Sequence, residues 1–153
     1  MNVNLILFPA FLAFNAFATA QCPDFQLSDL QALQRAEPEK KENEIQLHGF
    51  DLRSAFELQG EAIRQYSKCW YSSAGDQPVF EQLIWWNQTS NSIVFLTVNE
   101  AQFKGLRQRI VERQSSGRIT ENPDFYLGKM FRYRFGTRQV EHATYYFVEI
   151  GFP

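Results

Sequence analysis

The sequence has little of the chemistry on which small metal proteins depend. Cysteine and histidine each occur only twice among its 153 residues. That is too few for a zinc ribbon, an iron–sulfur protein or a knottin, so we expect no metal and no cofactor. The chain also has no nucleophile elbow, metalloprotease helix, P-loop or dinucleotide-binding glycine pattern. These absences favour a protein that is not an enzyme.

A strong excess of one charge is absent as well. The net charge is −2, charged residues make up 21% of the chain and hydrophobic residues 44%. This ordinary composition excludes intrinsic disorder, collagen-like repeats and a polytopic membrane protein. Aromatic residues, in contrast, are abundant at 16%, with 15 Phe, 6 Tyr and 3 Trp.

The first twenty residues contain no charged side chain. An apolar run at Leu5–Phe14 is followed by Ala18, Thr19 and Ala20, which form a small-residue cleavage pattern. Although the usual basic residue near the N-terminus is missing, the pattern is typical of a secretory signal peptide. A membrane anchor is disfavoured because the apolar run is short. We therefore expect a signal peptide at 1–20, a single domain at 21–153, and a periplasmic or secreted protein.

The two cysteines are 47 residues apart, at Cys22 and Cys69. An exported protein with two cysteines usually joins them, and closing this loop is worth ~4 kcal/mol in the chain-entropy model. A lipid-modified Cys22 is disfavoured because Gln21, just before it, is not a small residue. The sequence therefore predicts a Cys22–Cys69 disulfide that fixes the start of the mature chain to the domain.

Hydrophobic periodicity predicts an α+β fold with a mainly antiparallel sheet and two helices. The expected order is helix, four strands, helix, two strands. A capping serine opens the first helix, which resumes at Pro38, and Asn99 caps the second helix. The segments are a helix at 28–36 that continues to 47, strands at 52–58, 62–71, 79–86 and 92–98, a helix from 100, and strands at 125–135 and 145–152.

The clearest local signal is a hairpin with a short polar loop at 87–91. It pairs Trp86 with Ile93 and Ile84 with Phe95. Both faces of this hairpin are apolar, so we expect it to be central and covered on both sides. The alternative is that one side is an exposed patch, and hence an interface.

A second hairpin is expected at the end of the chain. Matching the apolar faces of the last two strands pairs Phe131 with Val148 and Tyr133 with Tyr146. Arg132 then lies opposite Phe147 and diagonal to Glu149, a favourable neighbour.

The overall layout resembles small uncharacterised exported proteins of Gram-negative bacteria. The features that carry the resemblance are a signal ending at Ala20-Gln21, the helices, a Gly49-Phe50 junction and the aromatic hairpins. The resemblance covers most of the chain, rests on pattern, and implies no particular activity.

Charge is distributed unevenly along the chain. Residues 21–103 hold 6 basic and 12 acidic side chains (−6), whereas residues 104–138 hold 9 and 3 (+6). The basic stretch either faces the acidic part of its own chain or forms a basic face that attracts an acidic partner. Nucleic acid is an unlikely partner, since the isoelectric point is about 5.7 and no nucleic-acid-binding motif is present. The candidate contact residues are Arg107, Arg109, Arg113, Arg132 and Arg134, with Trp85 as an apolar anchor.

The sequence thus favours a non-catalytic exported protein that binds a protein partner in the envelope or outside the cell. An inhibitor, an immunity-type protein or an envelope assembly factor fits this description. The alternative is a small-ligand or carbohydrate-binding module that uses surface tryptophans. Salt distinguishes the two, because ionic strength weakens a charge-held partner while sugar stacking barely changes.

Overall fold

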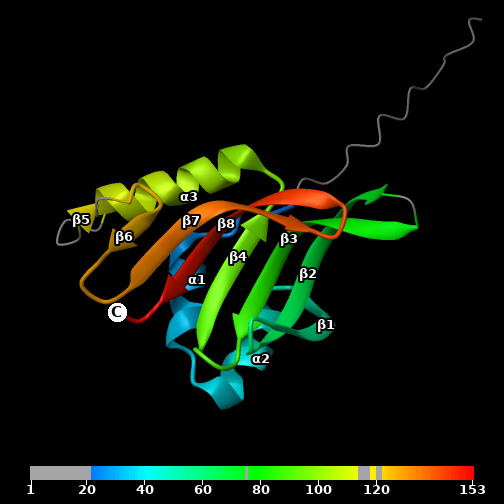
Figure 1. The fold of residues 1–153 in the computed structure, drawn as a ribbon, viewed down its shortest axis with the longest axis horizontal. Helices are drawn as coiled ribbons and strands as arrows, with labels where there is room; N and C mark the ends of the chain where they lie inside the picture. Colours follow the sequence, from blue (N-terminus) through cyan, green and yellow to red (C-terminus); the bar gives the residue numbers. More distant parts are fainter. Residues whose placement is uncertain (1–21, 75, 114–117, 120–121) are drawn as a thin grey trace, which may run out of the picture.

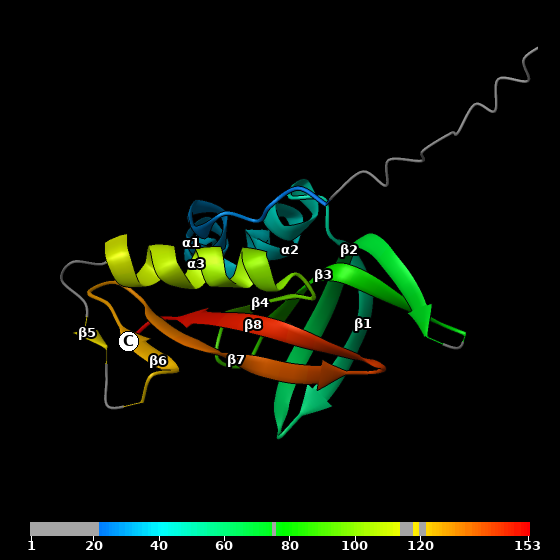
Figure 2. The same cartoon turned by 90° about the horizontal axis from the view of Figure 1, so that it is seen from above.

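The computed structural model describes residues 22–74, 76–113, 118–119 and 122–153. Within these residues, three helices lie on one face of an eight-stranded sheet (Figures 1 and 2). The fold is therefore α+β, as predicted. The expected signal peptide at 1–20 lies outside the described residues. None of the described helices is long and apolar enough to cross a membrane.

The described chain has one helix more than predicted, because the N-terminal helical region is divided in two. α1 (Leu27–Arg35) and α2 (Pro38–Leu47) are separated by Ala36 and Glu37, whose ψ angles of 136° and 143° are extended. Pro38 disfavours a helical conformation at the residue before it and suits the first position of a new helix. α3 (Glu100–Arg113) follows the fourth strand.

Each pair of neighbouring strands in the sheet is antiparallel. Their order across the sheet is β1-β2-β3-β4-β8-β7-β6-β5. The central β3–β4 hairpin has the predicted register, with Trp86 opposite Ile93 and Ile84 opposite Phe95. The strands are β1 (Asp51–Leu58), β2 (Glu61–Ala74), β3 (Gln77–Asn87), β4 (Ser92–Thr97), β5 (Arg118–Ile119), β6 (Phe125–Leu127), β7 (Arg132–Val140) and β8 (Ala143–Gly151).

The last hairpin departs from the prediction. The strand expected at 125–135 is two strands, β6 and β7. Val148 pairs with Phe135 instead of Phe131, and Arg132 lies opposite Gly151 instead of Phe147. A two-residue turn after Val140 sets this register, which is four residues from the predicted one. Because four is an even number, the residues of β7 and β8 keep their predicted faces, and face matching could not detect the error.

The larger core lies between the helices and the sheet. Leu30, Leu33 and Ile45 of α1 and α2, and Leu106 and Ile110 of α3, contribute its helical side. The alternate residues of the strands contribute its other side: Tyr66, Ile84, Trp86, Ile93, Phe95, Tyr133, Phe135, Val148 and Ile150. This core fixes which face of each strand is turned away from the helices.

A second cluster of buried side chains lies on the helix-free face of the sheet. It includes Leu83 and Trp85 of β3, Leu96 of β4, and Phe147 of β8. The ring of Phe56, on edge strand β1, meets Trp85 edge to face at 5.3 Å. From the other side, the Arg138 guanidinium of β7 lies 5.0 Å from the Trp85 ring. Since four strands lie between β1 and β7 in sheet order, the sheet curls on this face and covers Trp85.

Cys22 and Cys69 lie at disulfide distance, with their Cα atoms 5.8 Å apart. The pairing predicted from the sequence is therefore present. It ties the segment before α1 to strand β2.

Candidate functional site

Strand β7 carries a row of arginines on the helix-free face. Tyr133 and Phe135 point into the core beneath the helices, so Arg132 and Arg134 point the other way. Arg138 shares their face, since it contacts Trp85. We call Arg132, Arg134 and Arg138 the arginine row. Neighbours two residues apart on a strand are about 7 Å apart, so the three cations form an extended line.

Aromatic rings support two members of the row. The Arg134 guanidinium lies 5.9 Å from the Phe147 ring, and that of Arg138 lies 5.7 Å from the same ring. Phe147 occupies this place because Gly136 faces it: a Cβ atom on Gly136 would be 2.8 Å from the ring. Stacking of this kind holds a guanidinium in place while leaving its N–H groups available to a partner.

Only part of the row's charge is neutralised. Arg134 donates from Nε to Glu149 Oε2 at 2.9 Å. Arg132 and Arg138 have no carboxylate partner in the part of the chain that the structure describes. A cavity of about 220 Å³ lies beside Arg132 and Arg134, with Phe125 on its wall.

In the described part of the chain, direct ion pairs with the acidic half neutralise little of the basic stretch. Among the described residues four ion pairs are present, and only that of Lys104 with Glu100 joins the two segments, as neighbours on one helix. The four pairs are Lys40–Glu37, Arg64–Glu42, Lys104–Glu100 and Arg134–Glu149.

The arginines of α3 do not join the row, which corrects the prediction of one basic face. Arg107 lies over the ring of Phe135, on the helix side of the sheet, and donates to the Pro123 carbonyl at 2.9 Å. Arg109 donates to Gln26 Oε1 at 2.6 Å. α3 packs on one face of the sheet while the row lies on the other, so the predicted set is divided. The side chain of Arg113 lies outside the described residues.

Trp85 is not a surface anchor, because its side chain is buried. It is 6% exposed, and its Nε1 donates to Gln65 Oε1 at 2.7 Å. Two other aromatic side chains, Trp70 (66%) and Tyr71 (58%) of β2, are exposed instead. The strand bulges between Trp70 and Ser72, which interrupts the alternation of its faces there.

The sequence prediction did not include Arg138 among the basic residues of this face. Its signal was the spacing, since Arg132, Arg134 and Arg138 are separated by even numbers and share one face of any strand that contains them. The end of the strand was needed as well. Arg138 belongs to the strand only because β7 continues to Val140, beyond the predicted end at residue 135.

The two histidines lie in different parts of the molecule. His48 packs edge to face on Phe25, with ring centroids 5.8 Å apart, whereas His142 lies in the turn between β7 and β8. Across the described ranges, no three His, Cys, Asp or Glu side chains gather in a group that could hold a metal ion.

Searches for similar proteins do not assign the site. Comparison with protein-family models, curated proteins and solved structures gives no match for this chain.

Proposed function

We propose that the protein is an exported, non-catalytic binding protein whose arginine row engages an acidic surface of an envelope or extracellular protein. The observation that carries the proposal is the line of three cations on the helix-free face, of which only Arg134 has a carboxylate partner among the described residues. An inhibitor, an immunity-type protein or an envelope assembly factor acts through such a surface.

Two physical features support a role in binding. A line of like charges attracts an acidic partner before contact and speeds its capture. The stacked guanidiniums of Arg134 and Arg138 are already held in position, so less side-chain entropy is lost when a partner binds. Guanidiniums also match carboxylates with two parallel hydrogen bonds, which adds specificity.

The test is a capture experiment with the exported chain at low and high salt. A partner held by the arginine row is retained at 50 mM salt and leaves at about 1 M, where the screening length falls to about 3 Å. The double variant Arg132→Glu with Arg138→Glu should weaken its binding at least about tenfold. Arg134 is left unchanged, because its reversal would also break its pair with Glu149.

The matched control is Lys40→Glu, a charge reversal on α2. The Lys40 side chain is exposed and lies in the helix layer, away from the row. It should leave the affinity and the salt dependence unchanged. If the double variant and the control retain the partner equally well, the arginine row is not the contact surface.

One observation favours the alternative function, a carbohydrate-binding module. Trp70 and Tyr71 are exposed side by side in the sequence, and exposed aromatic rings can stack on sugars. In that case Trp70→Ala would abolish binding to an immobilised glycan, and salt would have little effect. The double arginine variant would bind the glycan normally.

A further inference from the structure

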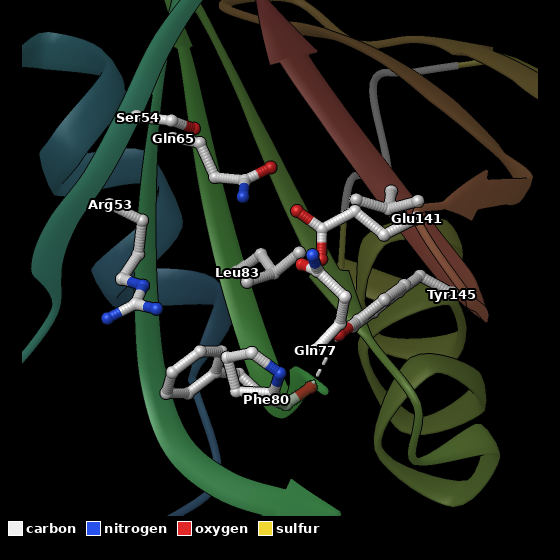
Figure 3. A pocket seen from close by; sticks show the side chains of 10 residues that line it. Arg53, Ser54, Gln65, Gln77, Phe80, Leu83, Glu141 and Tyr145 are labelled. Carbon is white, nitrogen blue, oxygen red and sulfur yellow. Dashed lines mark hydrogen bonds between the residues drawn. The ribbon is translucent and has the colours of Figure 1, made fainter. Parts of the chain in front are cut away.

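A small polar cavity lies elsewhere on the helix-free face. Its volume is about 110 Å³, and it lies between strands β1–β3 and the turn that joins β7 to β8 (Figure 3). Strand β3 contributes three apolar lining residues, Pro78, Phe80 and Leu83. Its polar lining residues come from β1, β2, the start of β3, the β7–β8 turn and β8: Arg53, Ser54, Gln65, Gln77, Glu141 and Tyr145.

The cavity has a cation on one side and an anion on the other. Arg53 of β1 and Glu141 of the β7–β8 turn both line it, and Figure 3 shows them on opposite sides. They form no ion pair with each other, and neither side-chain charge has an opposite partner in the described part of the chain. Both charges are therefore available to a ligand placed between them.

Internal contacts hold several of the lining groups in place. The Arg53 guanidinium lies 4.8 Å from the Phe80 ring. The Gln65 Oε1 accepts a hydrogen bond from buried Trp85, which leaves the Gln65 amide N–H groups for the cavity. The Tyr145 hydroxyl donates to the Phe80 carbonyl at 2.7 Å and can still accept a hydrogen bond. A cavity whose polar groups are fixed in advance loses less entropy on binding.

The backbone conformation at Glu141 makes it possible to test its side chain separately from the turn. Its φ is +52°, in the left-handed region, at the first residue of a two-residue hairpin turn. Turns with a positive φ there favour glycine, and another residue is strained. The chain nevertheless has a glutamate at this place, and its carboxylate points towards the cavity (Figure 3).

We propose that this cavity binds a small zwitterion, a free amino acid or a dipeptide. The ligand carboxylate pairs with Arg53, its ammonium group pairs with Glu141, and the amides of Gln65 and Gln77 complete its hydrogen bonds. Because the two charges of the cavity cancel, a phosphate or a polyamine would each meet one repulsive group. This site is separate from the arginine row and does not depend on the function proposed for it.

Dialanine with its termini free or blocked tests the ligand chemistry by calorimetry on the exported chain. Dialanine with both termini free should bind. Its N-acetylated form and its amide should each bind at least about tenfold more weakly, since each loses one charge-assisted contact. Absence of binding by both free alanine and free dialanine would overturn the proposal. The proposal would also be overturned if the doubly blocked peptide bound as tightly as free dialanine, or if glucose bound and dialanine did not.

Variants of Glu141 separate the ligand role from a structural one. Glu141→Gly should raise the urea midpoint of unfolding, because it relieves the strained φ, and yet lower the affinity for dialanine at least about tenfold. Glu141→Gln keeps the strain and the shape and should lose affinity to a similar degree. Unchanged affinity in Glu141→Gln would overturn the proposal.

A matched control is available in the turn between β1 and β2. Gln59 also has a φ of +52°, in the turn between β1 and β2, and it does not line the cavity. Gln59→Gly should raise the urea midpoint as Glu141→Gly does, and leave dialanine binding unchanged. Loss of binding in this variant would show that the turns act on the site through the fold and not through the carboxylate.

Discussion

Lys41 is the most unusual single residue of the molecule. Its side chain is fully buried, and its Nζ donates to Asn91 Oδ1 at 2.8 Å and to the Gln34 carbonyl at 3.3 Å. It has no carboxylate partner among the described residues. Burial lowers the pKa of Lys41 from 10.5 to about 8. The folded protein therefore binds this proton less tightly than the unfolded chain does.

This pKa predicts a rise in stability with pH. Below about pH 8 the lysine is protonated in both states, and the penalty of burying the charge is constant. Between pH 8 and 10.5 the folded state has released the proton while the unfolded chain holds it, so the free energy of unfolding increases, by at most about 1.4 kcal/mol per pH unit. Urea denaturation at pH 7, 8, 9 and 10 measures the slope.

The variant Lys41→Met isolates the contribution of this lysine. Its free energy of unfolding should rise less steeply between pH 8 and 10 than that of the wild type, since the other groups titrate equally in both proteins. The range stops at pH 10 because burial raises the pKa of Tyr145 to about 12, and the unfolded tyrosine begins to ionise near pH 10. Parallel profiles for the two proteins would show that Lys41 does not titrate in this range.

Strand β7 has no space for a side chain at Gly136. A Cβ atom there would be 2.8 Å from Phe147 Cε1 and 3.0 Å from Cζ. We expect Gly136→Ala to displace the ring that supports Arg134 and Arg138, and to cost about 1–3 kcal/mol, as overpacking does. Thermal and urea unfolding check the loss. A variant as stable as the wild type would show that Phe147 moves aside freely.

At the scale of elements, the sequence predicted what depends on local pattern. The predicted register of the β3–β4 hairpin was correct. Both of its strands are apolar, and its short polar loop leaves one register, which places Trp86 opposite Ile93. The β7–β8 register was wrong because face matching is blind to an even shift, and the turn at Glu141 decides it. The restart of helical structure at Pro38 was predicted, but the two segments were counted as one helix, whereas α1 and α2 are separate helices.

Helix α3 contains a glycine that its fold does not require. A Cβ atom on Gly105 would have no other atom within 4 Å, apart from its own helix. Glycine within a helix is about 1 kcal/mol less favourable than alanine. We therefore expect Gly105→Ala to raise the free energy of unfolding by about 0.5–1 kcal/mol, measured by urea denaturation at pH 7. A loss of stability would mean that α3 packs more closely at this point than the structure shows.

At the scale of the whole molecule, the curl of the sheet decides what is buried. Trp85 contacts Phe56 of β1 and Arg138 of β7, which come from opposite parts of the sheet. Alternation along β3 showed only that Trp85 and Trp86 lie on opposite faces. Whether a helix-free face is exposed depends on the approach of strands distant in sequence, and periodicity within one strand contains no information about that approach. The candidate arginines were divided for the same reason, since Arg107 is on α3, which packs on one face of the sheet, while the side chain of Arg132 lies on the other face.

The disulfide constrains the whole chain, because it closes a loop of 47 residues that includes α1, α2 and β1. In the chain-entropy model a loop of this length is worth ~4 kcal/mol, through restriction of the unfolded state. The double variant Cys22→Ser with Cys69→Ser should therefore lose about 2–5 kcal/mol of unfolding free energy, the usual range for native disulfides of small secreted domains. Urea denaturation with and without reductant makes the comparison. Reductant should lower the wild-type stability to that of the variant and leave the variant unchanged. If the wild type is equally stable with and without reductant, the core between the helices and the sheet holds the N-terminal segment without the covalent link.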